Sequence, residues 1–410
     1  MTHVLFCLRH FNDIDNVVPA IHFTLERRHV VITVLIYSVD YDFREDVSLR
    51  FLQEKWGERV RVVWIGELAG FPRAALRVPL RSKLLARPKR SVRRFNKATV
   101  KWLRPLFADW GTPQRVVFDQ NRTGVISGLL ATLRELGVKH IVSLPVSPWM
   151  NFNVLRQTDF IDLQDQNFST KHDYSGFDAI GQVDGFYASQ LEKIFGLLGL
   201  ASPFRGLVEV LGSIRYTREW LAIRDGYVSR ARQPKIRSSS APNGKKVLII
   251  PSHRKNNSFW DEYLRTLAFL AQFENYQFAV KPHTRYGDGY ENLPKNIDLY
   301  PGVDTSVLID WADIILFWSS SAALEGFQKG HTMIRLEYLN GNRSTYEELG
   351  AGYACHSRDD LLEVMLSPET MANAEMQSVS GAEILRQQII EGGKGPDVVD
   401  RVVRFCVGDS

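Results

Sequence analysis

The sequence predicts an α/β protein made of two doubly wound, Rossmann-like domains that face each other across a cleft. Short strands rich in Val and Ile alternate with amphipathic helices along the chain, which is typical of parallel sheets. The same pattern restarts at Lys245, after a segment rich in Ser, Pro, Gly and Lys. The length of 410 residues also suits two domains of roughly 200 residues each.

Each expected strand of the first domain is followed by a polar loop and, in most cases, an amphipathic helix. We expect strands at 3–8, 29–37, 114–120 and 139–145, and helices at 16–28 and 123–137. The loop RHFNDID (9–15) separates the first strand from the first helix. The first domain is therefore predicted to span 1–228, with a linker at 229–244.

The second domain is predicted at 245–390 by the same reasoning. Its expected strands are 245–252, 276–282, 297–301, 313–318 and 332–338, and its expected helices are 260–273, 303–312 and 322–330. A C-terminal helix is expected in 391–410, and one arrangement open to it is to pack against the first domain. Ligands of doubly wound sheets bind beyond the carboxyl ends of the strands, so the loops that follow strands are the places to search.

Composition favours a protein of the cytoplasm. Hydrophobic residues make up 44% and charged residues 24%, and no apolar run reaches the roughly 18 residues of a membrane span. The first residues, MTHVLFCLRHFND, are not expected to act as a signal peptide. The 3 cysteines are far apart, which favours a reducing compartment over a disulfide framework or a zinc site.

The positive charge is concentrated in one segment. Residues 73–104 contain twelve Lys or Arg and no Asp or Glu, interleaved with Leu, Val, Phe and Trp. Such a segment can lie on an anionic membrane surface or hold a polyanionic acceptor, and a solvated helix face is the alternative. No recognised nucleic-acid-binding module accompanies the charges, so a nucleic-acid partner is not expected.

Two loops of the first domain carry candidate catalytic or acceptor-binding residues. The loop after the first strand holds His10, Asp13 and Asp15, and the loop after the third holds Asp119, Asn121 and Arg122. Asp13 or Asp119 can serve as the general base on an acceptor hydroxyl. The other reading is that these side chains cap the following helices. His10, Asn121 and Arg122 are assigned to acceptor binding, and no metal site is expected.

Two loops of the second domain carry cations at equivalent positions. His253, Arg254 and Lys255 follow its first strand, and Lys281, His283 and Arg285 follow its second, which Pro282 ends. If the strands are neighbours, five of these side chains converge on one anion, namely Arg254, Lys255, Lys281, His283 and Arg285. Each charged hydrogen bond contributes about 1.5–3 kcal/mol. We therefore expect a diphosphate site, with a basic surface turn as the alternative.

A third loop of the second domain supports the same ligand. Ser319, Ser320 and Ser321 lie where a strand leads into a helix, and free N–H groups at a helix start bind phosphate. A single serine that caps the helix is the alternative. Glu325, one turn later, is assigned with His253 to the hydroxyls of a donor sugar or ribose. Gly326 permits close packing of this helix.

These motifs resemble the donor half of GT-B glycosyltransferases of bacterial envelope synthesis. The resemblance is to the group with CDP-glycerol glycerophosphotransferases and capsule or lipopolysaccharide Kdo transferases, and more distantly to UDP-GlcNAc epimerases. It rests on Lys281-Pro282-His283 and on Asp313 followed by the serines and Glu325. GGKGPDVVDRVVRFC and VLGSIRYTREW resemble the closing helix and the interdomain segment of such enzymes. In the first domain, RHFNDID replaces the usual glycine-rich loop.

The resemblance implies a glycosyltransferase, and no cofactor is expected. No metal ion is expected to be needed, because fixed cations and a helix dipole neutralise the leaving phosphates. Its partners are an activated sugar donor and a glycan or lipid-linked acceptor, such as a growing O-antigen or capsule polysaccharide. The enzyme is expected in the cytoplasm or as a peripheral protein on the inner face of the membrane. Phosphoribosyl transfer, glycerophosphate transfer from CDP-glycerol and a UDP-GlcNAc 2-epimerase-like activity stay open as alternatives, as does a sugar-binding module without turnover.

Overall fold

The computed structural model describes most of the chain, in two compact units. The described residues are 1–8, 11–37, 46–64, 103–119, 123–144, 150–155, 174, 176–185, 189, 192, 195–196, 207–229, 236, 244–252, 258–283 and 289–408. Unit 1 comprises Met1–Ser147, Asp165–Trp220 and Ile390–Ser410, and unit 2 comprises Pro148–Gln164 and Leu221–Ile389. The chain passes from one unit to the other inside helix α8 (Arg218–Val228), before the predicted linker.

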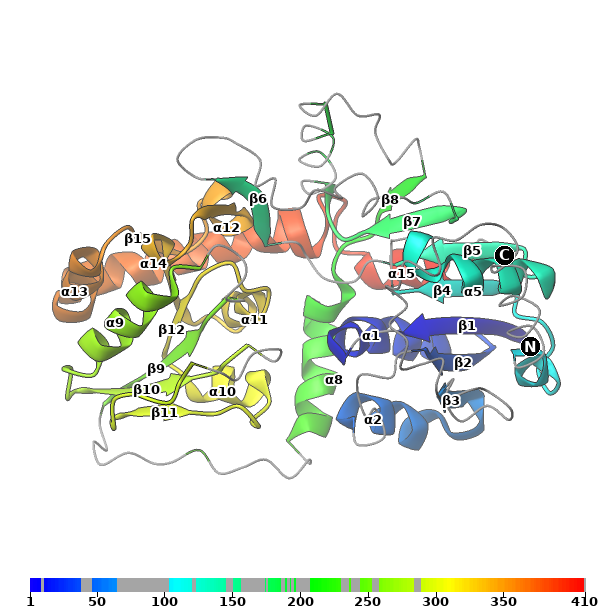
Figure 1. The fold of residues 1–410 in the computed structure, drawn as a ribbon, viewed down its shortest axis with the longest axis horizontal. Coiled ribbons are helices and arrows are strands. Elements are labelled where there is room, and N and C mark those ends of the chain that lie inside the picture. Colours follow the sequence, from blue (N-terminus) through cyan, green and yellow to red (C-terminus); the bar gives the residue numbers. More distant parts are fainter. Residues whose placement is uncertain are drawn as a thin grey trace. The chain divides into compact units, whose positions relative to one another are not determined.

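Unit 1 is a parallel sheet with the strand order β3-β2-β1-β4-β5-β7-β8 (Figure 1). Its strands are β1 (Thr2–Leu8), β2 (Val30–Ile36), β3 (Val60–Trp64), β4 (Arg115–Phe118), β5 (His140–Ser143), β7 (Ala179–Gln182) and β8 (Val208–Val210). Its helices are α1 (Phe11–Arg27), α2 (Val47–Trp56), α5 (Thr123–Glu135) and α15 (Val398–Val407). The order reverses between β1 and β4, so this is the doubly wound topology that the sequence predicts.

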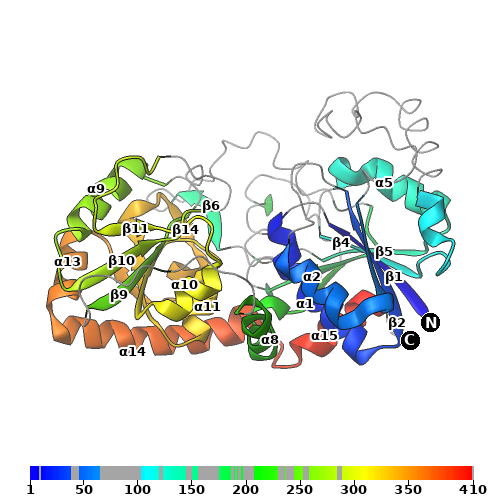
Figure 2. The same ribbon diagram turned by 90° about the horizontal axis from the view of Figure 1, so that it is seen from below.

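The central strands of unit 1 are buried on both faces. All seven residues of β2 are buried, and its sequence, VVITVLI, has no polar–apolar alternation. Continuous apolar strands of this kind are typical of parallel sheets covered by helices on both sides. Leu5 and Cys7 of β1 pack with Leu130 and Leu133 of α5, and α1 lies on the opposite side of the sheet (Figure 2). Helix α15 packs beside α1, where Arg27 pairs with Asp400.

The predicted loop at 9–15 is wrong over most of its length, because α1 already begins at Phe11. Ile14, Val17, Val18 and Ile21 are fully buried, so the helical spacing of apolar residues extends upstream of the predicted start at residue 16. Carboxylates in the first turn are also favoured by the partial positive charge at a helix start. Asp13 and Asp15 therefore belong to a helix and not to a loop.

Unit 2 is a second parallel sheet, with the order β11-β10-β9-β12-β13-β15. Its strands are β9 (Lys245–Ile250), β10 (Tyr276–Val280), β11 (Ile297–Leu299), β12 (Ile314–Phe317), β13 (Thr332–Leu336) and β15 (Tyr353–Cys355). Its helices are α9 (Trp260–Leu270), α10 (Thr305–Trp311), α11 (Ala323–Gln328), α12 (Thr345–Glu348), α13 (Arg358–Leu366) and α14 (Pro368–Leu385), which ends in a π-helical turn (Arg386–Ile390). A short antiparallel pair joins β6 (Asn151–Leu155) to β14 (Asn342–Ser344).

Helices cover both faces of the second sheet. Val247 and Ile249 of β9 pack with α9 and α13 on one face, and Figure 2 shows α10 on the other side of the strands from α9. A Cβ built on Gly326 of α11 would lie 2.6 Å from Ile315 Cδ1 of β12. The close packing expected at this glycine is therefore present.

The predicted strands and helices of both sheets are confirmed, with ends that shift by a few residues. Strands β3, β6, β7, β8, β14 and β15 were not among the predicted strands. Most of the basic segment 73–104, and most of the predicted linker 229–244, lies outside the described residues. In the described part of the chain, every helix is too short or too polar to cross a membrane.

Candidate functional site

The candidate site lies at the carboxyl edge of the sheet in unit 2. The strand order reverses between β9 and β12, and loops on either side of such a point form the ligand crevice of doubly wound sheets. Val247 of β9 pairs with Phe278 of β10 and with Ile314 of β12, so the three strands are in direct register. The loops after β10, β9 and β12 therefore follow one another along this edge, as the sequence predicts.

The three serines follow β12 after one residue, Trp318, and Ser319 adopts a left-handed backbone conformation with φ 47°. Among the described residues other than glycine, Ser319 has the one positive φ. Such a conformation costs about 1–3 kcal/mol and is concentrated at functional sites. The conformation is held by the neighbouring loop, because the Asn340 side-chain amide donates to Ser319 Oγ at 2.8 Å.

The residues around this turn are held from two further sides. The Tyr346 hydroxyl donates to the Ser320 carbonyl oxygen at 2.8 Å. The Trp318 indole donates to Ser258 Oγ at 3.3 Å, and Ser258 forms a β-bridge with Asn340. The ends of the loops after β9, β12 and β13 thus form one connected structure.

The turn offers groups suited to an anion. Ser319, Ser320 and Ser321 are each partly exposed. In the part of the chain that the structure describes, no acceptor is found for the N–H groups of Ser320, Ser321 and Ala322. Successive free N–H groups in a tight turn form a small anion-binding concavity, and serine hydroxyls add further donors.

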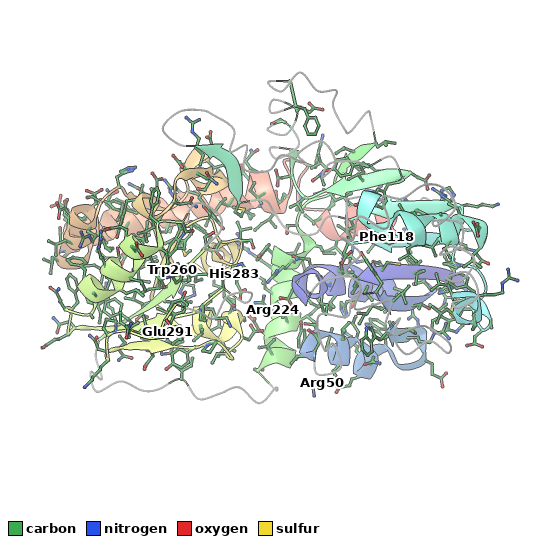
Figure 3. The ribbon with its side chains drawn as sticks, in the orientation of Figure 1. Arg50, Phe118, Arg224, Trp260, His283 and Glu291 are labelled. Carbon is green, nitrogen blue, oxygen red and sulfur yellow. The ribbon has the colours of Figure 1, made fainter. Side chains whose placement is uncertain are left out.

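The segment after β10 contributes Lys281 and His283. Lys281 is 7% exposed, and its ammonium donates to the Pro301 carbonyl oxygen at 2.9 Å. Burial lowers its pKa, and the charge of Asp304 opposes this shift. His283 is partly exposed and lies at the end of the same segment (Figure 3). Lys281 therefore ties the loop after β10 to the loop after β11, and His283 is the more accessible of the two.

Several predicted site residues lie outside the described residues, or have side chains that are not described. These are His10, Asp13, Asn121, Arg122, His253, Arg254, Lys255 and Arg285.

Glu325 of α11 lies in a buried charge cluster. Its carboxylate is 2% exposed, pairs with Arg224 of α8 and lies 3.1 Å from Lys329 Nζ. Figure 3 shows Arg224 on α8. Burial alone would raise the pKa of Glu325, but the two cations outweigh it and hold the pKa below its usual value. The Glu325 carboxylate is therefore paired with two cations of its own unit.

Three aspartate side chains lie near the carboxyl ends of the strands in unit 1. Asp119 follows β4, is 7% exposed, and accepts a hydrogen bond from the Tyr37 hydroxyl at 3.1 Å. Asp15 of α1 lies 3.4 Å from the guanidinium of Arg215. Asp46 caps α2 by accepting from the Leu49 N–H at 2.9 Å. Asp119 is thus placed at the ligand-binding edge of its sheet, with an orienting hydroxyl beside it.

Sequence reasoning missed Asp46 and Asn340. Burial raises the pKa of Asp46 to about 6, and the nearby charge of Asp15 adds to the rise. The signal for Asp46 was its position before the apolar run of α2, which is typical of a helix cap. No local pattern marks Asn340, because its partner Ser319 is 21 residues away in the sequence.

Solved structures with a similar fold include UDP-GlcNAc 2-epimerases and a glycosyltransferase. The S. aureus MnaA–UDP co-structure matches with a TM-score of 0.58 at 11% identity, over 98% of this chain and 95% of that chain. UDP-GlcNAc 2-epimerase from Neisseria meningitidis bound to UDP-GlcNAc matches with a TM-score of 0.55 at 11% identity, over 98% and 100%. The glycosyltransferase SnogD from Streptomyces nogalater matches with a TM-score of 0.51 at 12% identity, over 98% and 99%.

The chain has the GT-B fold. Both its epimerase-type and its glycosyltransferase neighbours align over nearly the whole chain, which confirms the predicted fold class. No protein-family model and no curated protein matches the sequence. Since a shared GT-B fold hosts more than one chemistry, the activity has to be argued from the site.

Proposed function

We propose that the chain is a GT-B glycosyltransferase whose nucleotide-sugar donor binds at the carboxyl edge of unit 2. The observation that carries this proposal is the turn at Ser319–Ser321, which presents free N–H groups and hydroxyls at the point where the strand order reverses. Two neighbours of the same fold hold UDP or UDP-GlcNAc, which supports a nucleotide sugar as the donor.

The proposed site binds the diphosphate of the sugar nucleotide through neutral and cationic hydrogen-bond donors. The serine turn supplies N–H groups and hydroxyls, and His283 supplies an imidazole from the loop after β10. Arg254, Lys255 and Arg285 are proposed to add charge. Preorganised donors of this kind stabilise the negative charge that develops on a leaving diphosphate. The proposed mechanism therefore requires no metal ion.

The transfer step forms one bond and breaks one. The acceptor hydroxyl oxygen bonds to the anomeric carbon of the sugar, and the bond between that carbon and the diphosphate oxygen breaks. The electron pair leaves with the diphosphate, and the hydroxyl proton passes to a carboxylate of unit 1. Asp119 is our first candidate for this base, since its Tyr37 partner orients the carboxylate. Asp13 is the second candidate.

The acceptor is proposed to be a glycan or lipid-linked polysaccharide of the cell envelope. This part of the proposal rests on the resemblance to the CDP-glycerol glycerophosphotransferase and Kdo transferase group, and on the basic segment 73–104. Twelve cations among apolar side chains would attract a lipid-linked acceptor at an anionic membrane surface. Transfer of phosphoribosyl or glycerophosphate groups would use the same donor-side residues.

A 2-epimerase-like activity is the second candidate. Epimerisation requires a group that removes a proton from carbon and a group that returns one. The Asp46 carboxyl, with a pKa raised to about 6, lies near the charge of Asp15. A carboxyl group with a raised pKa suits the acid role in such a reaction.

A ligand panel tests the donor, and product analysis tests the reaction. Thermal unfolding with UDP, GDP, CMP, CDP and phosphoribosyl pyrophosphate should give one clear stabilisation, because a ligand that binds the folded state raises the melting temperature. The matching sugar nucleotide should then be consumed in the presence of a glycan acceptor. Conversion of the sugar nucleotide to its epimer in the absence of an acceptor would favour epimerase activity over transferase activity. Binding without turnover across an acceptor panel would indicate a sugar-binding module.

A further inference from the structure

Ser319 adopts a backbone conformation that its side chain disfavours. Its φ of 47° lies in the left-handed region, where a Cβ crowds the backbone and glycine is the usual residue. The other described residues with positive φ are all glycines. A serine held there needs surrounding contacts that select this conformation over the ordinary ones.

Asn340 supplies such a contact. Its side chain is 1% exposed, and its amide nitrogen donates to Ser319 Oγ at 2.8 Å. The amide oxygen accepts from the Asn342 N–H at 2.9 Å, which fixes the orientation of the amide. The Asn340 backbone N–H donates to the Glu337 carbonyl at 3.1 Å. Asn340 is therefore hydrogen-bonded at both its backbone and its side chain.

The conformation of Ser319 decides where the next N–H groups lie. A left-handed residue directly after a strand reverses the chain, and the N–H groups that follow can then point to a common centre. Tyr346 holds the Ser320 carbonyl oxygen, so the turn is fixed on its other side as well. Relaxation of Ser319 to an ordinary φ would move the N–H groups of Ser320 and Ser321 together.

We propose that Asn340 is a positioning residue for the donor diphosphate. It keeps Ser319 left-handed and thereby keeps the N–H groups of Ser320 and Ser321 arranged for the phosphate oxygens. This inference rests on the proposed function of the turn. It adds a specific dependence: binding should require Asn340 when residue 319 carries a side chain, and much less when residue 319 is glycine.

The test is a double-mutant cycle between residues 319 and 340. The four proteins are the full-length wild type, Asn340→Ala, Ser319→Gly and the double variant. Calorimetric titration measures the Kd of whichever of UDP, GDP or CDP stabilises the wild type most. We expect Asn340→Ala to weaken binding at least about tenfold in the wild type and no more than about twofold in the Ser319→Gly protein, because glycine adopts a positive φ without support.

Two further variants separate positioning from general stability. Ser319→Ala removes the same hydrogen bond from the other side and should weaken binding as much as Asn340→Ala, which keeps the test decisive if Asn340→Ala fails to fold. Thr266→Val removes a buried hydroxyl that lies 3.0 Å from Tyr338 Oη in unit 2. This control should lower the melting temperature and leave Kd within twofold.

Each outcome bears on a separate claim. Equal losses of affinity from Asn340→Ala in both backgrounds, or no loss in either, would overturn the positioning role and leave the proposed function standing. A wild-type protein that binds none of the three diphosphates would overturn the proposed function and this inference with it.

Discussion

The change Glu325→Gln removes one negative charge from the buried cluster of unit 2 and keeps the size of the side chain. Glu325 is 2% exposed and Arg224 is 8% exposed, so water cannot replace the lost partner. Loss of one member of a buried ion pair costs about 3–5 kcal/mol. Arg224 keeps Asp225 at 3.3 Å, and Lys329 keeps Asp225 and Asp310 at 2.9 and 2.6 Å. We therefore expect a loss of about 3 kcal/mol, at the lower end of that range.

The measurement is urea unfolding of the full-length protein, monitored by circular dichroism and tryptophan fluorescence. The double variant Arg224→Met/Glu325→Leu should return to within about 1 kcal/mol of the wild type, because apolar replacement of both partners avoids a buried unpaired charge. Glu383→Gln is the matched surface control. Its pair with Arg386 is exposed, and we expect a loss below about 0.5 kcal/mol.

The same variant decides between two roles of Glu325. The sequence suggests that its carboxylate accepts from donor hydroxyls, whereas the structure pairs it with two cations. If Glu325→Gln unfolds at the wild-type urea concentration but loses affinity for the sugar nucleotide, the structural role assigned to the cluster is refuted. A large loss of stability with unchanged affinity supports it.

Three further predictions concern titration and the donor turn. Asp46→Asn keeps the helix cap and should make the fold more stable than the wild type above pH 6. The wild type loses at most about 3 kcal/mol of stability as the pH rises from 3.8 to about 6, because the pKa of Asp46 is raised over that range. An Asn variant that is still more stable than the wild type at pH 3 would contradict this prediction. Burial, together with the charge of Lys55, lowers the pKa of His22 from 6.5 to about 4. The wild type should therefore lose about 3 kcal/mol of stability as the pH falls through this range, and His22→Asn should not show this loss in unfolding measured against pH. The same pH dependence in both proteins would refute the lowered pKa of His22. The double change Ser320→Ala/Ser321→Ala should weaken nucleoside diphosphate binding about tenfold by calorimetry, and intact affinity would remove the serine turn from the donor site.

The sequence allowed the two sheets to be predicted, because their signals are local. Runs such as VVITVLI in β2, and Pro282 after β10, reveal buried strands and their ends within a few residues. The predicted start of α1 was wrong, since Asn12 and Asp13 resemble a loop although the apolar spacing continues through Ile14. Local composition outweighed periodicity in that prediction.

The contacts that define the candidate site depend on residues far apart in the sequence. Glu325 pairs with Arg224, 101 residues earlier, and Ser319 is held by Asn340, 21 residues later. Neither Arg224 nor Asn340 belongs to a sequence motif. Glu325 was therefore assigned to ligand binding from its position one turn after the serines alone. The position of Ser319 at the edge of the sheet was predictable from the end of β12, whereas its left-handed conformation was not.

Hydrogen–deuterium exchange with the best-binding sugar nucleotide tests the central claim most directly, because it reports where in the chain the donor binds. We expect slower exchange of amides in residues 281–283 and 319–322 on ligand addition, and weaker protection in Ser320→Ala/Ser321→Ala at a ligand concentration near the wild-type Kd. Protection confined to unit 1, with no change in these two segments, would contradict a donor site at the carboxyl edge of unit 2.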